Sequence, residues 1–402
     1  MVRKKPSIEK STKAFSASYK YERVGNFFNA VKSYVEAGEL YAALNDKLME
    51  AEANLFAGHC SLLQINRTGS IEEFKKLLKS AIDFWEATRR IYIKLELQDI
   101  KPNVRGAIID SSLFLSDLAN LLEEQDLAKR KSKFFDIVKG LEKCSAIYEK
   151  YENFEKAGIV EYWSGIMKLK NYVYMDEEER EEILNGAIIN FNNSKKFFEN
   201  AKKERPSLCF SNLIIKAKIA RVLESRETDE NKKMELSTIR EEIIKSQSES
   251  SLCEGFGALN KSWLEFNQAL FVKNIGERFH LLQSAKKLAE QTLPVLIKDK
   301  EQSLSAEAYF ISAMASKELS EMISIVGDYE AILKSAHEDF RECLKYAKIM
   351  DETWLIARAL AEILGIIADY SILLQSEVLK RDILREGASI GREALEYVKK
   401  LP

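Results

Sequence analysis

Few residue groups in this sequence could carry out a reaction. One of its three histidines lies in Glu277-x-x-His280, which is half of the pattern that holds two iron ions in helical bundles. That chemistry needs a second Glu-x-x-His unit and two further glutamates, and the sequence has no second copy. His337-Glu338 begins like a helical zinc motif but lacks a second histidine four residues later. We therefore expect no metal site and no metal cofactor.

Other motifs that serve catalysis are also incomplete. Gly255-Phe256-Gly257 supplies the first two glycines of a dinucleotide-binding loop, but it lies in a helical pattern with no strand before it. The acidic run from Asp176 to Glu179 lies at an expected helix start, where negative charge favours the positive end of the helix dipole. His59 is expected to pack or to make a polar contact between helices. We expect no catalytic residue, no cofactor and no enzymatic activity.

The elements that position these residues are predicted to be long helices. The 402 residues include only 16 glycines and 5 prolines, well below the usual shares of ~7% and ~5%. Apolar residues follow the helical period of ~3.6 almost throughout. This pattern predicts about sixteen helices, the first over 7–22 and the last over 377–400.

Small and apolar residues recur every 51 positions in the last third of the chain. The columns are Gly255/Ala306/Ala357, Gly257/Ala308/Ala359, Ala285/Ala336/Gly387, Leu282/Leu333/Leu384, Leu293/Leu344/Leu395 and Leu296/Ala347/Val398. A fixed period of this size is typical of stacked helical repeats. We predict an all-α fold, an α-solenoid of about eight antiparallel helical hairpins, with Ala306, Ala308, Ala336, Ala357 and Ala359 buried between helices.

The repeat pattern is weakest over 229–250. Polar residues occupy 246–251, where apolar residues are expected. The predicted organisation is an N-terminal helical-repeat block over 1–228, a degenerate repeat and possible joint over 229–250, and a C-terminal block over 251–402. The alternative is one continuous solenoid.

The first hundred residues carry a family signature. Gly25-Asn26-Phe27, Ala30, Tyr34, Ala37 and Leu40 have the spacing of the second helix of a tetratricopeptide repeat, and Ala53, Leu55, Gly58, Gly69, Phe74, Leu78 and Ala81 are similar to the next unit. This region resembles tetratricopeptide repeats, and its longer helices are similar to those of the soluble fusion-attachment proteins. The resemblance implies a right-handed superhelix whose concave groove holds a peptide or another protein.

The charge balance and the cysteines indicate which partners and which cellular compartment to expect. The 61 Lys and Arg nearly balance the 63 Asp and Glu, so nucleic acid is not an expected partner. Five cysteines, Cys60, Cys144, Cys209, Cys253 and Cys343, are widely spaced and form no C-x-x-C pair. We expect free thiols in a reducing compartment.

No apolar run approaches ~18 residues, and the charged start lacks the apolar core of a signal peptide. The prediction is a cytoplasmic protein without a membrane span.

Aromatic residues are the candidates for partner binding, since Tyr and Trp are favoured anchors at protein interfaces. They are Trp85, Tyr162, Trp163, Tyr172, Tyr174, Trp263 and Trp354. The predicted function is a non-enzymatic scaffold that binds a protein or peptide in its groove. The alternatives are a regulatory or sensory peptide-binding module of a signalling system and a helical-repeat RNA-binding protein, which the near-neutral charge disfavours. The sequence leaves the partner and the oligomeric state open.

Overall fold

The protein is seen in a computed structural model that describes residues 7–95, 100–124, 126–205, 208–245, 251–323, 326–374 and 376–401. These residues form sixteen α-helices and two short 3-10 helices and contain no strand, so the prediction of an all-α fold with about sixteen helices is confirmed. The helices are α1 Ile8–Arg23, α2 Phe27–Ala43, α3 Lys47–Gln64, α4 Ile71–Lys94, α5 Pro102–Leu121, α6 Leu127–Lys150, α7 Phe154–Asn171, α8 Glu177–Asn200, α9 Phe210–Glu224, α10 Asp229–Lys245, α11 Ser251–Phe271, α12 Ile275–Lys298, α13 Gln302–Glu321, α14 Val326–Ile349, α15 Thr353–Leu373 and α16 Glu377–Val398; the 3-10 helices are η1 Ile65–Arg67 and η2 Tyr172–Tyr174.

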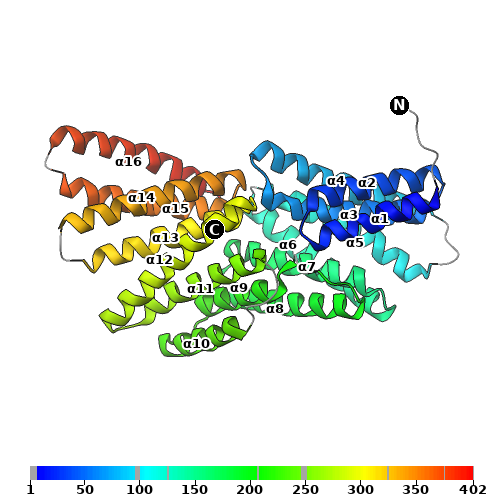
Figure 1. The fold of residues 1–402 in the computed structure, drawn as a ribbon, viewed down its shortest axis with the longest axis horizontal. Coiled ribbons are helices and arrows are strands. Elements are labelled where there is room, and N and C mark those ends of the chain that lie inside the picture. Colours follow the sequence, from blue (N-terminus) through cyan, green and yellow to red (C-terminus); the bar gives the residue numbers. More distant parts are fainter. Residues whose placement is uncertain are drawn as a thin grey trace. The chain divides into compact units, whose positions relative to one another are not determined.

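The chain divides into two compact units, whose helices are drawn in Figure 1. Unit 1 comprises 1–65 and 72–217, and unit 2 comprises 66–71 and 218–402. In unit 1, α1 packs against α2, α2 against α3, and α5 to α8 pack in sequence; in unit 2, each helix from α10 to α16 packs against the next. Each of these helices thus packs against one or both of its neighbours in the chain, as in repeat architectures.

Short polar side chains set several helix starts. The side chains of Ser7, Asn26, Asp46, Asp126, Asn274 and Ser376 each accept a hydrogen bond from a backbone N–H in the first turn of the helix that follows. Such caps satisfy donors that have no partner inside the helix. Before Asn26, Gly25 makes the turn from α1 to α2 with a φ of 72°, a left-handed conformation that glycine adopts without a steric penalty.

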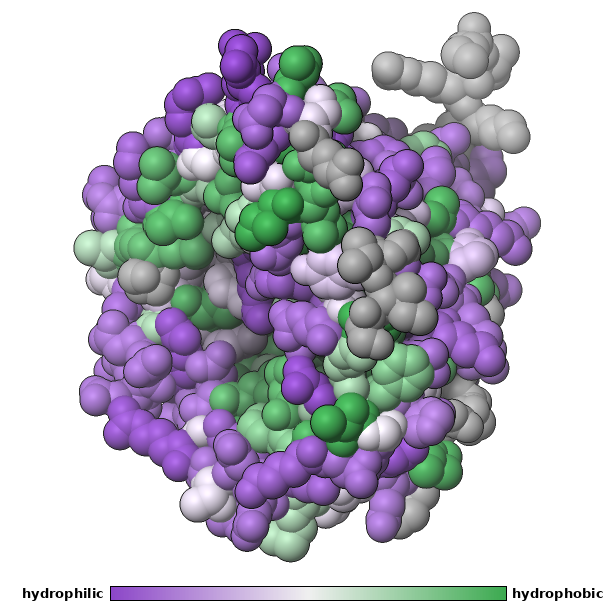
Figure 2. All heavy atoms as spheres, turned by 90° about the vertical axis from the view of Figure 1, so that its left-hand side faces the viewer, coloured by the Kyte–Doolittle hydropathy of each residue, from purple (hydrophilic) through white to green (hydrophobic). Residues whose placement is uncertain are grey.

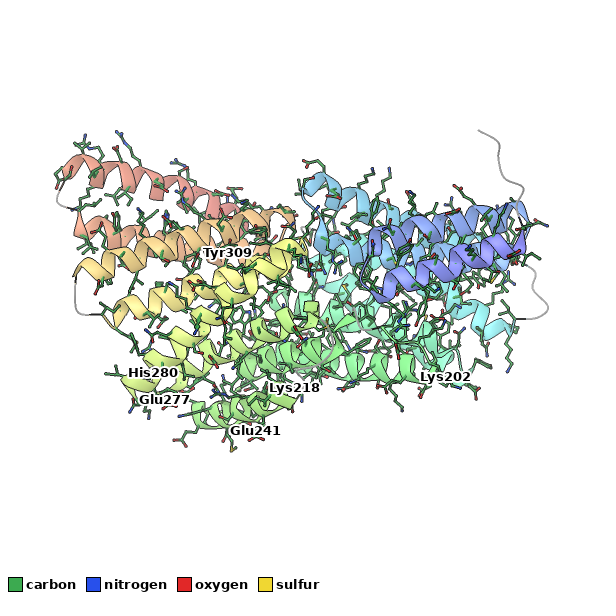
Figure 3. The ribbon with its side chains drawn as sticks, viewed as in Figure 1. Lys202, Lys218, Glu241, Glu277, His280 and Tyr309 are labelled. Atoms are coloured by element: carbon green, nitrogen blue, oxygen red, sulfur yellow. The ribbon has the colours of Figure 1, made fainter. Side chains whose placement is uncertain are left out.

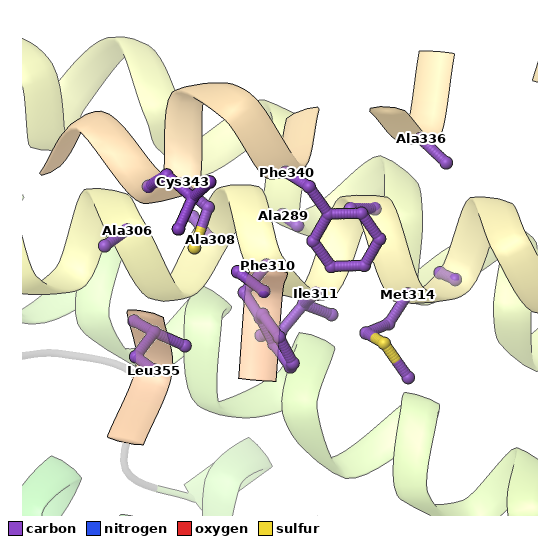
Figure 4. Close-up of a cluster of buried hydrophobic side chains, with 14 of the residues drawn as sticks. Ala289, Ala306, Ala308, Phe310, Ile311, Met314, Ala336, Phe340, Cys343 and Leu355 are labelled. Carbon is purple, nitrogen blue, oxygen red and sulfur yellow. The ribbon is translucent and has the colours of Figure 1, made fainter. Parts of the chain in front are cut away.

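The core of unit 2 is built on the 51-residue columns. Ala306, Ala308, Ala336, Ala357 and Ala359 are all buried, so the prediction for these alanines is confirmed. Figure 4 shows several of them with the large rings of the same core. Alanine lets neighbouring helices approach closely, and the rings fill the remaining space at the high density typical of protein interiors. The columns therefore mark equivalent packing positions in successive repeats.

The segment predicted to be a joint is only partly described. Over 229–245 it forms α10, which buries Leu236, Ile239 and Ile243. The polar stretch 246–250 lies outside the described residues, and Ser251 begins α11. The block boundaries proposed from the sequence stay a prediction.

The predictions about a membrane span and about free cysteines can be compared with the structure. Among the described residues, none of the helices combines the length and apolarity needed to cross a membrane. Cys60, Cys144 and Cys343 are buried free thiols, whereas Cys209 and Cys253 are disulfide-bonded. The expectation that all five thiols are free is therefore wrong for two of them, because spacing along a sequence does not show which cysteines form disulfides.

Candidate functional site

The residues that first suggested metal chemistry have no completed ligand set in the described chain. Figure 3 shows Glu277 and His280 on α12, where both side chains are exposed. Within the described residues, no group of three or more His, Cys, Asp or Glu side chains could hold a metal ion. The acidic run at the start of α8 pairs with a cation instead, since Lys131 on α6 contacts Asp176 and also Glu179, the latter at 2.9 Å.

A group of polar side chains in unit 1 is buried around His59 of α3. Nε1–H of Trp163, on α7, donates to Nδ1 of His59 at 3.0 Å. Nε2 of His59 therefore carries the ring proton, and it lies 3.6 Å from Oε1 of Glu22 without a hydrogen-bond partner. Burial lowers the pKa of His59 to about 3, so the imidazole is neutral at physiological pH. The expectation that His59 makes a polar contact between helices is confirmed.

The charge of Glu22, at the end of α1, is balanced by Arg205. Nη1 of Arg205 donates to Oε1 of Glu22, and Nη2 donates to Oε1 of Glu155 on α7 at 2.7 Å. Tyr34 of α2 also donates its hydroxyl to Oε2 of Glu22, at 3.2 Å. Burial lowers the pKa of Arg205 to about 10 and raises the pKa of Glu155. Arg205 therefore stays cationic at neutral pH, so the buried carboxylate of Glu22 is paired.

This group of residues joins parts of unit 1 and gives a substrate no access. The side chains of Glu22, His59 and Arg205 are at most 1% exposed. The contacts link α1, α2, α3 and α7 to the segment that follows α8. A buried ion pair with additional hydrogen bonds requires a specific arrangement of its neighbours. We conclude that this buried cluster holds the elements of unit 1 in a specific arrangement. Its members are Glu22, His59, Glu155, Trp163 and Arg205.

Three of the predicted partner-binding aromatics are buried in unit 1. Trp85 is completely buried, and its Nε1–H donates to the carbonyl of Leu55 at 3.3 Å. The rings of Tyr162 and Trp163 meet edge to face with centroids 5.0 Å apart, beside His59. These three rings fill the interior of unit 1.

The other four predicted aromatics are half-buried. Tyr172 and Tyr174 lie in η2, and the guanidinium of Arg130 stands 4.0 Å from the ring centroid of Tyr174. In unit 2, Trp263 stacks on Phe310 with centroids 6.1 Å apart. Arg358 lies over both Phe310 and Trp354. The structure thus brings Trp263 and Trp354 to one group of contacts around Phe310, and a role for these aromatics in partner binding stays a prediction.

A line of apolar and small residues on α16 differs from these sites because it is uncovered. Its members are Leu384, Ala388, Gly391, Leu395 and Val398, here called the outer stripe. Their successive spacings of 4, 3, 4 and 3 residues place them along one side of a helix, in the pattern of a helix–helix seam. Leu384, Leu395 and Val398 are 49%, 58% and 49% exposed. A different side of α16, with Gly387 and Ala394 buried, faces the core that includes α15.

The outer stripe continues columns that are buried in the preceding repeats. The residues that correspond to Leu384, Gly391, Leu395 and Val398 are Leu333, Phe340, Leu344 and Ala347 in α14, and Leu282, Ala289, Leu293 and Leu296 in α12. All eight are at most 9% exposed. Helix α12 packs against both α11 and α13, and α14 packs against both α13 and α15. The outer stripe therefore corresponds to the face of α12 and α14 that a further helix covers.

The N-terminal half of this face holds a shallow depression of about 410 Å³. It is lined by Glu377, Lys380, Arg381, Leu384, Arg385 and Ala388. These residues form two overlapping sets with the spacing i, i+3, i+4 and i+7, which is the arrangement that accepts one side chain of a facing helix in a coiled coil. Figure 2 shows apolar patches among polar residues on the side of the molecule that faces left in Figure 1. The geometry of α16 is thus that of a helix-docking surface.

The 51-residue columns of the sequence contain the signal for this surface. Leu384, Leu395 and Val398 belong to columns whose earlier members are buried, so their own exposure depends on whether a helix covers them. No signal pointed to the buried pair of Glu22 and Arg205, which are 183 positions apart.

Comparison with known proteins identifies no family. No protein-family model matches the chain, and no curated protein matches it. One solved structure with some similarity is a "Circular tandem repeat protein with novel repeat topology and enhanced subunit contact surfaces". It is 11% identical, the alignment covers 97% of this chain and 95% of that chain, and the TM-score is 0.26. This likeness is too low to support an argument about fold or function, and the description of this chain as an all-α helical-repeat protein rests on its own helices and columns.

Proposed function

We propose that this chain is a non-enzymatic helical-repeat protein that binds another protein by docking a helix of that protein on the outer stripe of α16. One observation carries the proposal: residues of the same columns are buried in α12 and α14 but exposed in α16. Burial of such apolar surface favours association by about 25 cal/mol for each Å² that is removed from water. An amphipathic helix laid into an apolar groove is a recurrent mode of protein recognition.

The proposal includes the architecture implied by the N-terminal resemblance. This is a tetratricopeptide-like, right-handed solenoid of about eight antiparallel hairpins, with a concave groove as a second surface for a protein or peptide. The burial of Ala30, Tyr34, Ala37, Ala53 and Ala81 supports it, because these signature positions serve packing between helices in that family.

An affinity capture with two baits tests the proposal. One bait is the wild-type chain, and the other carries Leu384→Glu and Leu395→Glu, which place charge on the outer stripe. A charged residue at a buried contact without a partner is strongly unfavourable. We expect a protein captured by the wild-type bait to be lost with this variant. A matched control carries Ile93→Glu and Ile189→Glu in unit 1, where both side chains are also exposed, and it should retain the captured protein.

Nuclease treatment separates this proposal from RNA binding. A protein held through the outer stripe stays bound after nuclease treatment, whereas one bridged by RNA is released. The proposal is wrong if the stripe variant captures the same proteins as the wild type and also leaves self-association unchanged.

A further inference from the structure

We propose that the partner helix is α16 of a second copy of this chain, packed antiparallel on the outer stripe and related to the first by a two-fold axis near Gly391. The inference rests on the proposed function, because it names the occupant of the same face. Symmetric dimers use the same surface patch on both subunits, so that surface must be complementary to itself. The outer stripe meets this requirement in both spacing and charge.

The spacing of the stripe is nearly symmetric about Gly391. Leu384 lies seven residues before it and Val398 seven residues after it, while Ala388 lies three before and Leu395 four after. An antiparallel copy centred on Gly391 therefore sets Leu384 opposite Val398 of the second copy. Val398 of the second copy then faces the depression beside Leu384 and can fill it as a knob fills a hole.

The middle of the stripe suits a close crossing of two helices. Gly391 has no side chain, and Ala388 has only a methyl group, so the backbones can approach at the axis. The nearest side-chain atoms to a Cβ built at Gly391 are those of Leu364, at 3.9 Å. Gly391 is therefore half-buried, and a Cβ there would make only ordinary van der Waals contact with α15.

The charges beside the stripe favour the antiparallel arrangement. Arg385 and Glu396 lie on the same flank, because a separation of eleven positions makes about three turns. Antiparallel pairing sets Arg385 opposite Glu396 of the second copy, twice by symmetry. Parallel pairing in register instead puts the two copies of Arg385 on opposite sides of the seam, and neither of them meets Glu396 of the other copy. Within one chain these groups make only exposed pairs, Arg385 with Asp382 at 3.6 Å and Glu396 with Lys399 at 3.1 Å.

Helix α1 of a second copy is a poorer occupant than α16. Its exposed side includes Glu9, Lys10, Thr12, Lys13 and Lys20, and these polar groups lose water when they face leucine side chains. An end-to-end stack of copies through α1 and α16 is therefore disfavoured relative to the symmetric pair.

Sedimentation equilibrium of the 402-residue chain provides the first test. A single pair of helices lies at the small end of stable interfaces, so we expect a dimer that dissociates on dilution. Leu384→Glu with Leu395→Glu should be a monomer at all concentrations, whereas the control with Ile93→Glu and Ile189→Glu should dimerise like the wild type. Unchanged circular dichroism shows that each variant is folded. A wild-type chain that stays monomeric up to about 0.5 mM, where even weak specific pairs associate, overturns the proposal.

A charge exchange tests the orientation. Arg385→Glu alone and Glu396→Arg alone should each raise the dimer dissociation constant about tenfold or more, because each puts two like-charge pairs across the interface. The variant with both changes should recover most of the wild-type affinity. The antiparallel pairing is contradicted if the single changes leave the dimer dissociation constant unchanged. It is also contradicted if the double change does not restore dimerisation.

Cross-linking tests the register. A mixture of Leu384→Cys and Val398→Cys chains should form mixed disulfide dimers under mild oxidation, faster than either variant alone and faster than wild-type chains, which report on the native cysteines. Cross-linking of Leu384→Cys chains to one another at a higher rate would overturn this register. If the wild type is monomeric but the stripe variant still loses a captured protein, self-pairing fails and the proposed function survives.

Discussion

Trp163 donates its indole N–H to Nδ1 of His59 across 3.0 Å, although the two residues are 104 positions apart in the sequence. This bond places the imidazole proton on Nε2, toward the carboxylate of Glu22. A residue that the sequence suggested as a binding anchor therefore orients a buried histidine between α3 and α7. Because the imidazole is buried and neutral, it makes the stability of unit 1 depend on pH.

We predict that His59 makes unit 1 less stable as the pH falls. Its pKa is lowered from 6.5 to about 3 in the folded chain, so below pH 6.5 the unfolded chain takes up a proton that the folded chain does not. Stability then falls by roughly 1.4 kcal/mol for each pH unit between these values. Wild-type protein should lose about 2–3 kcal/mol more than His59→Asn between pH 7 and pH 4.5, measured by urea unfolding. Asn can still accept the Trp163 hydrogen bond.

The contribution of Glu155 to stability has the opposite pH dependence. The comparison of wild-type protein with His59→Asn cancels this contribution. The pKa of Glu155 is raised by burial, so its contribution weakens as the pH rises through the interval between its unfolded and folded values. Both proteins retain Glu155, so the difference between them reports on His59. Equal pH profiles for the two proteins would show that His59 becomes protonated in the folded chain.

Replacing Arg205 by Met should destabilise unit 1 by about 3–5 kcal/mol, because it leaves Glu22 charged and buried without its cation. The further change Glu22→Gln removes that charge, and the double variant should be less destabilised than the sum of the two single changes. Denaturant unfolding of the four proteins measures this coupling. Additive effects would mean that the two side chains do not interact in solution.

Ala308→Phe should destabilise unit 2 by about 1–3 kcal/mol, because a ring does not fit where α13 packs in the core. Ala308 is completely buried. Ala331 on α14 is exposed, so Ala331→Phe is the matched control and should change the melting temperature little. Equal melting of Ala308→Phe and wild type would show that the alanine column is not a tight interface.

Gly58→Ala should destabilise unit 1 by about 1–3 kcal/mol through overpacking. A Cβ at Gly58 would lie 2.6 Å from Nε1 of Trp85, and this ring is buried and hydrogen-bonded. At Gly106 in α5 a Cβ meets nothing within 4 Å, so Gly106→Ala should stabilise by about 0.5–1 kcal/mol through the better helix propensity of alanine. Thermal unfolding of both variants provides the test, and the same sign for both would contradict it.

Local features of the sequence determined the helices and the repeat. Apolar residues at the helical period predict the helices, because each helix must bury one side wherever it lies. Caps such as Asp46 and Asn274 act within a single turn and set helix starts. The 51-residue columns predicted equivalent packing positions, and the burial of Ala308 and Ala359 bears this out.

Only the tertiary structure decided which distant residues meet and which faces stay open. Glu22 and Arg205 pair because α1 and the segment after α8 are brought together by the helices between them, and no local pattern encodes such a meeting. Leu333 and Leu384 are the same residue type in the same column, yet one is 1% exposed and the other 49%. The periodicity shows that a leucine needs a neighbour, but burial depends on whether another helix occupies the adjacent space, which is a property of the packed chain.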